Sequence, residues 1–195
     1  MTSTADALAR ALFIIVAFVL AGLAHSAWLG SRWSRALLIP LDGGLRVRGR
    51  RVFGHNKTVR GFVVMVPAAA LTFWGLSVVL SAVAPSVASG LWAIPSRDYA
   101  LLGAWAGLGF MLGELPNSFV KRQLGVAPGQ APLGSGRRLS FIVDRVDSIV
   151  GMLVVVSLMA PTPWMTWVYV LVIGPAIHLA FSVLLYRLGV KARPA

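Results

Sequence analysis

Long apolar blocks are the feature that most constrains the fold of this chain. Hydrophobic residues make up 57% of its 195 residues and charged residues only 12%. The apolar residues are grouped in stretches about as long as a helix that crosses a bilayer, unlike those of a soluble domain. The sequence therefore predicts an all-α polytopic membrane bundle, a single domain over residues 1–195. Its five predicted spans are about Leu8–Leu29, Phe62–Ala84, Tyr99–Leu115, Phe141–Ala160 and Trp164–Leu185.

The third predicted span is the shortest and ends in polar residues. Irregular or interrupted helices are tolerated inside a membrane only where they line a water-filled cavity. Pro116 follows directly, and proline removes a backbone donor and loosens a helix. We therefore expect this helix to stop inside a polar cavity near Leu115.

The basic residues orient the predicted bundle. Fifteen of the 18 Lys and Arg residues fall in two long loops, residues 30–60 and 121–140, and in the C-terminal tail. Basic loops remain in the cytoplasm, which predicts an external N-terminus, a cytoplasmic C-terminus and a site facing the cytoplasm, in a multi-pass protein of the cytoplasmic membrane. We attribute the net charge of +12 to this topology and to a phosphate-rich substrate, and expect no nucleic-acid partner.

The two basic loops are also rich in glycine. The favoured interpretation of Arg48, Arg50 and Arg51 is that they face lipid headgroups. Alternatively, the loop glycines let backbone amides approach phosphate oxygens. These glycines are Gly43, Gly44, Gly54 and Gly61.

Three of the six acidic residues lie in or beside apolar segments: Glu114, Asp144 and Asp147. An ionised carboxylate in hydrocarbon is costly and is rarely kept without a use. Asp144 and Asp147 are three residues apart, so on a helix they share a face and could bind one divalent cation, with Mg²⁺ suited to oxygen-only ligands. Arg145 points off that face, as a counter-ion or a phosphate contact. The alternative is an Asp–Arg–Asp set that neutralises itself and joins two helices.

The segment SFVKR follows the third predicted span. Lys121 and Arg122 either complement a helix C-terminus and fix topology, or bind a phosphate. Asn117 and Ser118 could complete a metal or phosphate shell. The three histidines, His25, His55 and His178, form no metal pair at helical spacing and are expected to be structural.

Four blocks, in this order, resemble the CDP-archaeol synthase family, which is related to the phosphatidate cytidylyltransferases. The third block contains the D-R-x-D-S pattern of the phosphatidate enzymes, and the four together cover most of residues 40–191. The blocks are IPLDGGLRVRGRRVFGHNKTVRGF, GELPNSFVKRQLGVAPGQAP, FIVDRVDSIVG and PAIHLAFSVLLYRLGVK.

The resemblance implies an enzyme that transfers CMP from CTP to a membrane lipid phosphate, giving a CDP-lipid and pyrophosphate. The implied partners are CTP and an archaetidic acid-like or phosphatidic acid acceptor in the bilayer. The implied catalytic residues are Asp144, Asp147 and Lys121, and the implied Mg²⁺ ligands are Asp144, Asp147 and Glu114. The implied substrate-binding residues are Lys57, Thr58, Arg60, Asn117, Ser118, Arg122 and Arg145.

The chain departs from the family pattern at three places. Glu114 stands where aspartate is usual, and His55–Asn56 replaces Asp-Gly before Lys57. The C-terminal residues 192–195 lack the usual acidic-Val-Pro-Trp ending. These differences suggest a divergent member and leave the lipid chains open between ether and ester linkage.

Two other functions match the sequence less well. A CDP-alcohol phosphotransferase would carry D-G-x-x-A-R followed by an aspartate pair, which the sequence after Asp42–Gly43 does not match. A small transporter would place carboxylates near mid-membrane and show internal repeats. Here the carboxylates of Glu114, Asp144 and Asp147 are expected near the cytoplasmic ends of the spans, and the sequence contains no internal repeat.

Overall fold

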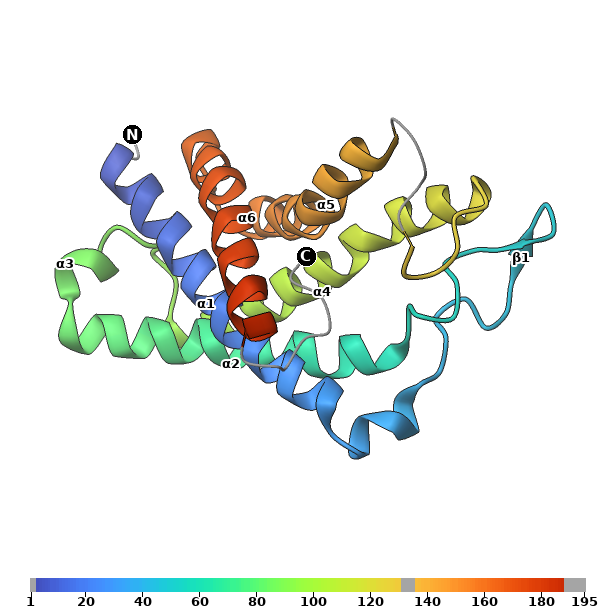
Figure 1. The fold of residues 1–195 in the computed structure, drawn as a ribbon. Coiled ribbons are helices and arrows are strands. Elements are labelled where there is room, and N and C mark those ends of the chain that lie inside the picture. The colour runs from blue at the N-terminus through green and yellow to red at the C-terminus, as the bar shows by residue number, and fades with distance from the viewer. Residues whose placement is uncertain (1–2, 131–135, 188–195) are drawn as a thin grey trace.

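The computed structural model describes residues 3–130 and 136–187, and it is an α-helical bundle with a small β-hairpin at one end (Figure 1). Each of the five predicted spans corresponds to one long helix, with two of them ending one residue beyond it, which confirms the all-α prediction. The elements are α1 (Thr4–Gly30), η1 (Trp33–Leu37), β1 (Arg46–Val47), β2 (Arg50–Arg51), α2 (Val59–Val83), α3 (Pro85–Ala88), α4 (Ser96–Gln123), α5 (Gly136–Met159) and α6 (Trp164–Arg187).

Apolar side chains cover much of the outside of the bundle. Leu71, Leu101, Leu158 and Val172 are each more than 60% exposed. Large exposed apolar surface of this kind is typical of contact with hydrocarbon. By length and composition, α1 and α2 could each cross a membrane.

The prediction that the third span stops near Leu115 is wrong. Helix α4 continues through Pro116 to Gln123. An internal proline removes a backbone donor and crowds the carbonyl four residues earlier. Close packing of α4 against α2 and α5 before Pro116, and the contacts of Asn117 and Lys121 with Asp144 after it, hold the helix together. The consequence is that Lys121 and Arg122 are presented from a helix instead of a loop.

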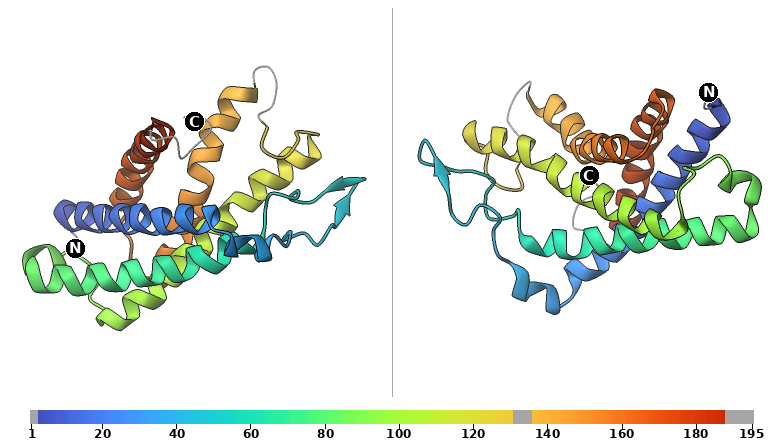
Figure 2. Two further views of the ribbon diagram at one scale, coloured as in Figure 1. Left: turned by 60° about the horizontal axis from the view of Figure 1, so that its bottom comes forward. Right: turned by 180° about the vertical axis from the view of Figure 1, so that it is seen from behind.

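The core forms where α1, α2 and α4 meet. Phe13 of α1 packs edge-to-face against Phe73 of α2, with ring centroids 5.1 Å apart, and against Tyr99 of α4 at 5.5 Å. Gly103 allows α4 to touch α2, because a Cβ there would overlap the carbonyl oxygen of Ala69. Two further views show α4 crossing α2 obliquely, with α6 packed against α1 (Figure 2).

Buried Arg10 joins three segments at one end of the bundle. Its guanidinium donates to the carbonyl oxygens of Gly90 at 3.1 Å, Leu91 at 3.3 Å and Pro161 at 2.9 Å. The start of α1, the α3–α4 connection and the α5–α6 connection therefore lie together. The hairpin and the polar ends of α4 and α5 lie at another end (Figure 1).

Candidate active site

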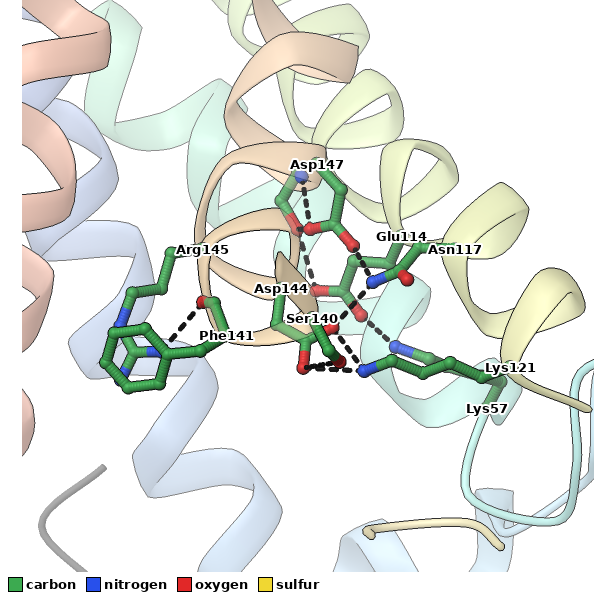
Figure 3. Close-up of polar contacts among 10 residues, drawn as sticks. Lys57, Glu114, Asn117, Lys121, Ser140, Phe141, Asp144, Arg145 and Asp147 are labelled. Carbon is green, nitrogen blue, oxygen red and sulfur yellow. Dashed lines mark hydrogen bonds and ion pairs between the residues drawn. The ribbon is translucent and has the colours of Figure 1, made fainter. Parts of the chain in front are cut away.

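Polar residues on α4 and α5 face each other near the hairpin end of the bundle (Figure 3). The α4 residues recur at intervals of three and four, and those of α5 follow the same period, so each set forms one helix face. The set comprises Glu114, Asn117 and Lys121 from α4, and Ser140, Asp144, Asp147 and Ser148 from α5.

Glycines bring these two faces into contact. A Cβ on Gly113 would lie 2.5 Å from the carbonyl oxygen of Asp147, and one on Gly109 would lie 2.7 Å from that of Gly151. Any larger residue at these positions would push the backbones apart. These glycines therefore set the distance between the carboxylates on the two helices.

The two aspartates meet at one amide group. Asn117 Nδ2 donates to Asp144 Oδ1 at 2.6 Å and to Asp147 Oδ2 at 2.8 Å. The backbone N–H of Ser148 donates to Asp147 Oδ1 at 2.7 Å, and Ser148 Oγ donates to Glu114 Oε1 at 3.0 Å. The three carboxylates are thus linked through short polar bridges, as the shared-face prediction for the aspartates requires.

Two lysines neutralise part of this negative charge. Lys121 forms an ion pair with Asp144, with one Nζ–Oδ2 distance of 2.6 Å. Lys57, from the loop that precedes α2, forms an ion pair with Glu114. Pairing stabilises ionised carboxylates near hydrocarbon. Counted at formal charges, three carboxylates and two ammonium groups sum to −1.

Asp42 anchors the loop that carries Lys57. Its carboxylate is fully buried and accepts from the Arg51 guanidinium and from the backbone N–H groups of Gly44, Phe53 and Gly54 at 3.0–3.1 Å. Burial opposes ionisation, but these hydrogen bonds outweigh it and hold the pKa of Asp42 well below its usual range. The backbone N–H groups of Gly44 and Gly54, which the sequence suggested as phosphate ligands, thus donate to Asp42 instead.

The arginines of the hairpin are not all lipid-facing as predicted. Arg51 pairs with Asp42, and Arg50 donates to the carbonyl oxygen of Gln123 at the end of α4. Arg48, at the tip between the strands, is exposed. Arg50 therefore ties the hairpin to α4, whereas Arg51 holds the loop together internally. For the exposed Arg48, contact with lipid headgroups remains a prediction.

Arg122 is buried beneath the same loop. Its side chain is packed near Gly54, since a Cβ on Gly54 would lie 3.4 Å from Arg122 Cδ. Only 8% of the residue is exposed, and its Nε and Nη1 have no hydrogen-bond partner among the described residues. Buried guanidinium donors without partners are available to an anion.

The remaining predicted site residues do not take part in the polar contacts between α4 and α5. Arg145 lies away from the aspartates, stacks on Phe141 at 3.3 Å from the ring centroid and donates to its carbonyl oxygen (Figure 3). Thr58 and Ser118 are buried, and Thr58 bridges to Pro40. The side chain of Arg60 forms no ion pair with the carboxylates that the structure describes.

A cavity of about 330 Å³ begins at this cluster and extends among α1, α4, α5 and α6. Its polar end includes Glu114, Asp144 and Ser148. Its other walls are mainly aliphatic and aromatic, including Ile14, Phe18, Phe110, Met152, Val170 and Ile177. Such a space fits a molecule with a charged end and an apolar body.

A divalent cation fits the chemistry of part of this cluster. Asp144 and Asp147 supply oxygen ligands that already converge on Asn117. Within residues 3–130 and 136–187, no three Asp, Glu or His side chains form a ready ligand set. The predicted ligand role of Glu114 remains a prediction, because Glu114 is joined to Asp147 only through Ser148.

Sequence reasoning missed three supporting residues. Ser140 and Ser148 lie on the aspartate face of α5, at helical spacing from Asp144, which is the signal that could have identified them. In the sequence Asp42 stands out only as part of an Asp-Gly-Gly motif, because its role as a loop anchor depends on hydrogen bonds to residues up to 12 positions away.

Comparisons with known proteins point to one family. The model described as CarS-like, CDP-archaeol synthase, matches residues 37–194. The CDP-archaeol synthase of Halobacterium salinarum is 35% identical over 164 residues, which is 80% of this chain and 82% of that protein. The enzyme of that name from Methanoculleus marisnigri is 31% identical and covers 80% of this chain and 89% of its own length.

One solved structure has a similar fold. It is described as an intramembrane enzyme for archaeal membrane lipids biosynthesis. It aligns with a TM-score of 0.57 and 23% identity, covering 89% of this chain and 92% of that one.

Proposed function

Because this chain belongs to the CDP-archaeol synthase family, we propose that it transfers CMP from CTP to a membrane lipid phosphate, yielding a CDP-lipid and pyrophosphate. The observation that carries the proposal is the joined cluster of Asp144, Asp147 and Lys121 at the polar end of an apolar cavity. The cluster offers charge for phosphates, and the cavity offers an apolar environment for lipid chains.

The reaction requires no protein nucleophile. An oxygen of the lipid phosphate attacks the α-phosphorus of CTP and forms a new P–O bond. The bond from the α-phosphorus to the oxygen that bridges to the β-phosphorus breaks, and pyrophosphate leaves. Negative charge accumulates on phosphoryl oxygens, so catalysis consists of positioning and electrostatic stabilisation.

Asp144 and Asp147 are the proposed ligands of Mg²⁺, with Glu114 as the third carboxylate of the site. Mg²⁺ usually keeps several waters and binds one or two carboxylates together with substrate phosphates, which suits this set. When bound, the ion supplies neutralising charge for the phosphates. Asn117 holds the two aspartates in one orientation through its amide.

The basic residues are the proposed phosphate contacts. Lys57 and Lys121 each use part of their donor capacity on a carboxylate, and a lysine ammonium has three N–H donors, so each retains donors for a phosphate. Arg122 has unpaired buried donors. Arg60 and Arg145, together with the polar side chains of Thr58, Asn117 and Ser118, complete the proposed substrate-binding set.

The acceptor is proposed to be a two-chain lipid phosphate. Its phosphate would lie beside Glu114 and Asp144, and its hydrocarbon would begin in the cavity lined by α1, α5 and α6. Each buried CH₂ contributes about 0.8 kcal/mol, so a soluble sugar phosphate would lose this binding energy.

The proposed topology has five spans in the cytoplasmic membrane, an external N-terminus and a cytoplasmic site. It is supported by the clustering of the predicted external segments around Arg10. The hairpin, which carries Arg46, Arg48, Arg50 and Arg51, lies with the site at the other end. Residues 1–195 are proposed to form one catalytic domain.

A direct assay tests the proposal. Purified protein is incubated with radiolabelled CTP, Mg²⁺ and, in parallel, ether-linked and ester-linked lipid phosphates and a soluble polyol phosphate. Label in an organic-extractable CDP-lipid, together with equimolar pyrophosphate, is the expected result. Label transferred only to the soluble phosphate would exclude the lipid acceptor.

A further inference from the structure

Arg145 is a cation to which the described part of the protein gives no counter-ion. Its Nη1 donates to the carbonyl oxygen of Phe141 at 3.0 Å, and its guanidinium stacks on the Phe141 ring. Both partners lack a formal charge. Among the described residues Arg145 forms no ion pair, so its positive charge is left without a carboxylate.

The neighbouring aspartates are already engaged elsewhere. Asp144 pairs with Lys121, and Asp147 accepts from Asn117 and from the Ser148 N–H. At 3.6 residues per turn, consecutive residues project from a helix about 100° apart. Figure 3 accordingly shows Arg145 pointing away from the two aspartates. The self-neutralising Asp–Arg–Asp set, which the sequence left open, is therefore not what the structure contains.

The side of α5 that carries Arg145 borders the apolar cavity. Arg145 lines the 330 Å³ cavity next to Asp144, together with Phe18, Gly22 and Ser26 of α1. The residue is partly exposed, and its Nη2 donates to no described residue. A guanidinium has five N–H donors, of which the Phe141 carbonyl uses one. Arg145 thus offers donors to a ligand inside the cavity.

We infer that Arg145 binds the phosphate of the lipid acceptor from the α1 side of the cavity and does not hold CTP. A cation beside hydrocarbon is costly unless an anion accompanies it. A lipid whose chains occupy the apolar part of the cavity would bring that anion with its headgroup. The inference rests on the proposed function and narrows it, because it assigns Arg145 to the acceptor alone.

The stacked geometry suits this role. The planar guanidinium can donate to two phosphate oxygens at once, which a lysine ammonium cannot do with the same geometry. The Phe141 ring fixes the plane of the guanidinium, so Phe141 is a positioning residue. Lys57 and Lys121, which pair with carboxylates of α4 and α5, remain on the other side of the site for the phosphates of CTP.

Substitutions at Arg145 separate the acceptor from CTP in steady-state assays. Arg145→Met keeps a long stem without charge, and Arg145→Lys keeps the charge without the planar fork. We expect Arg145→Met to raise the KM for the lipid phosphate roughly ten- to a hundredfold and the KM for CTP less than twofold. Arg145→Lys should be intermediate. Arg137→Met, at an exposed arginine at the start of α5, is the matched control and should change neither KM.

Binding without turnover isolates the phosphate contact. A two-chain lipid phosphate and the uncharged lipid alcohol with the same chains are each added without CTP, and the unfolding temperature is measured. In the wild type and in Arg137→Met the phosphate should give the larger rise. In Arg145→Met the two lipids should give equal rises, because only the chains still bind.

An arginine that merely extends toward the membrane surface predicts a different result. The extra rise from the phosphate would then persist in Arg145→Met, and this persistence, or equal increases in both KM values, would overturn the inference. If Arg145→Met does not fold, Arg145→Lys decides, since an extra rise equal to that of the wild type would also overturn it. A wild-type protein that forms no CDP-lipid but keeps the extra rise would refute the proposed function and leave the phosphate contact standing.

Discussion

At the scale of single residues, the site depends on paired charges at the edge of an apolar environment. Asp144 and Glu114 each have a lysine partner, while Asp147 is held by Asn117 and the Ser148 N–H. Breaking a partly buried pair leaves an uncompensated charge, which costs more than the pair itself contributes. Substitutions that retain the shape but remove the charge are therefore the clearest probes.

Removing a basic contact should weaken substrate binding at the site but not at the hairpin tip. We predict that Lys121→Ala and Arg122→Ala each lower kcat/KM roughly ten- to a hundredfold, from loss of a charge-assisted contact of about 1.5–3 kcal/mol. Arg48→Ala should have little effect, because Arg48 is exposed. Equal losses at all three positions in steady-state assays would indicate a diffuse positive field instead of a site.

Asp42 should control the order of the loop that precedes α2. We predict that Asp42→Asn makes residues 43–56 more sensitive to limited trypsin digestion at neutral pH, because the ion pair with Arg51 and the charge-assisted amide contacts are lost. Asp98→Asn, which changes an exposed carboxylate at the start of α4, is the matched control. Indistinguishable digestion rates would contradict the anchoring role.

The wild-type loop should also respond to acid. The folded pKa of Asp42 is depressed, so the stability that it contributes is fully present above the unfolded value, about 3.9. This stability is lost as the pH falls below that value and through the folded pKa. In the wild type, hydrogen exchange of the loop amides, which does not depend on trypsin activity, should therefore report constant loop stability from neutral pH down to about pH 4. Below that pH the loop should become less stable, because Asp42 begins to lose its contribution.

At the scale of helices, the contact between α4 and α5 determines the geometry of the carboxylates. We predict that Gly151→Ala lowers both kcat and the unfolding temperature, because an added methyl would overlap the backbone of Gly109. Gly75→Ala in α2, where nothing lies within 4 Å of the new Cβ, should leave the activity unchanged. Its unfolding temperature should be equal or higher, since alanine favours helix by about 0.5–1 kcal/mol. Full activity of Gly151→Ala would show that the close approach is not required.

The helices and the faces of the site could be predicted from sequence, but the pairings between segments could not. Spacing of three and four residues fixes which side chains share a helix face, and this placed Asp144 with Asp147. The ion pair of Lys57 with Glu114 joins residues 57 positions apart. It depends on how α2 crosses α4, which periodicity does not encode. The continuation of α4 past Pro116 likewise reflects tertiary packing that outweighs a local signal.

At the scale of the whole molecule, the two ends of the bundle have different chemistry. One end gathers chain connections around Arg10, and the other carries the hairpin, the carboxylates and the lysines. This polarity agrees with the proposed topology, in which the lipid reaches the site from the bilayer and CTP from the aqueous side that carries the hairpin.

The absence of cysteine makes the topology directly measurable. We predict that single cysteines introduced at Ser3 and Thr162 react with a membrane-impermeant maleimide in intact cells. Cysteines at Arg48 and Ala127 should react only after the membrane is permeabilised. Labelling of Arg48→Cys in intact cells, with no labelling of Thr162→Cys, would reverse the proposed orientation.

The central claim is that Asp144 and Asp147 enable CMP transfer to a lipid phosphate. The most direct measurement is the rate of CDP-lipid formation from labelled CTP, at saturating Mg²⁺, for Asp144→Asn, Asp147→Asn and the exposed control Asp98→Asn. We predict that both site variants lose activity while retaining membrane insertion and a wild-type size-exclusion profile, and that the control remains active. Near-wild-type turnover by either site variant would show that its carboxylate is not required and would contradict this account.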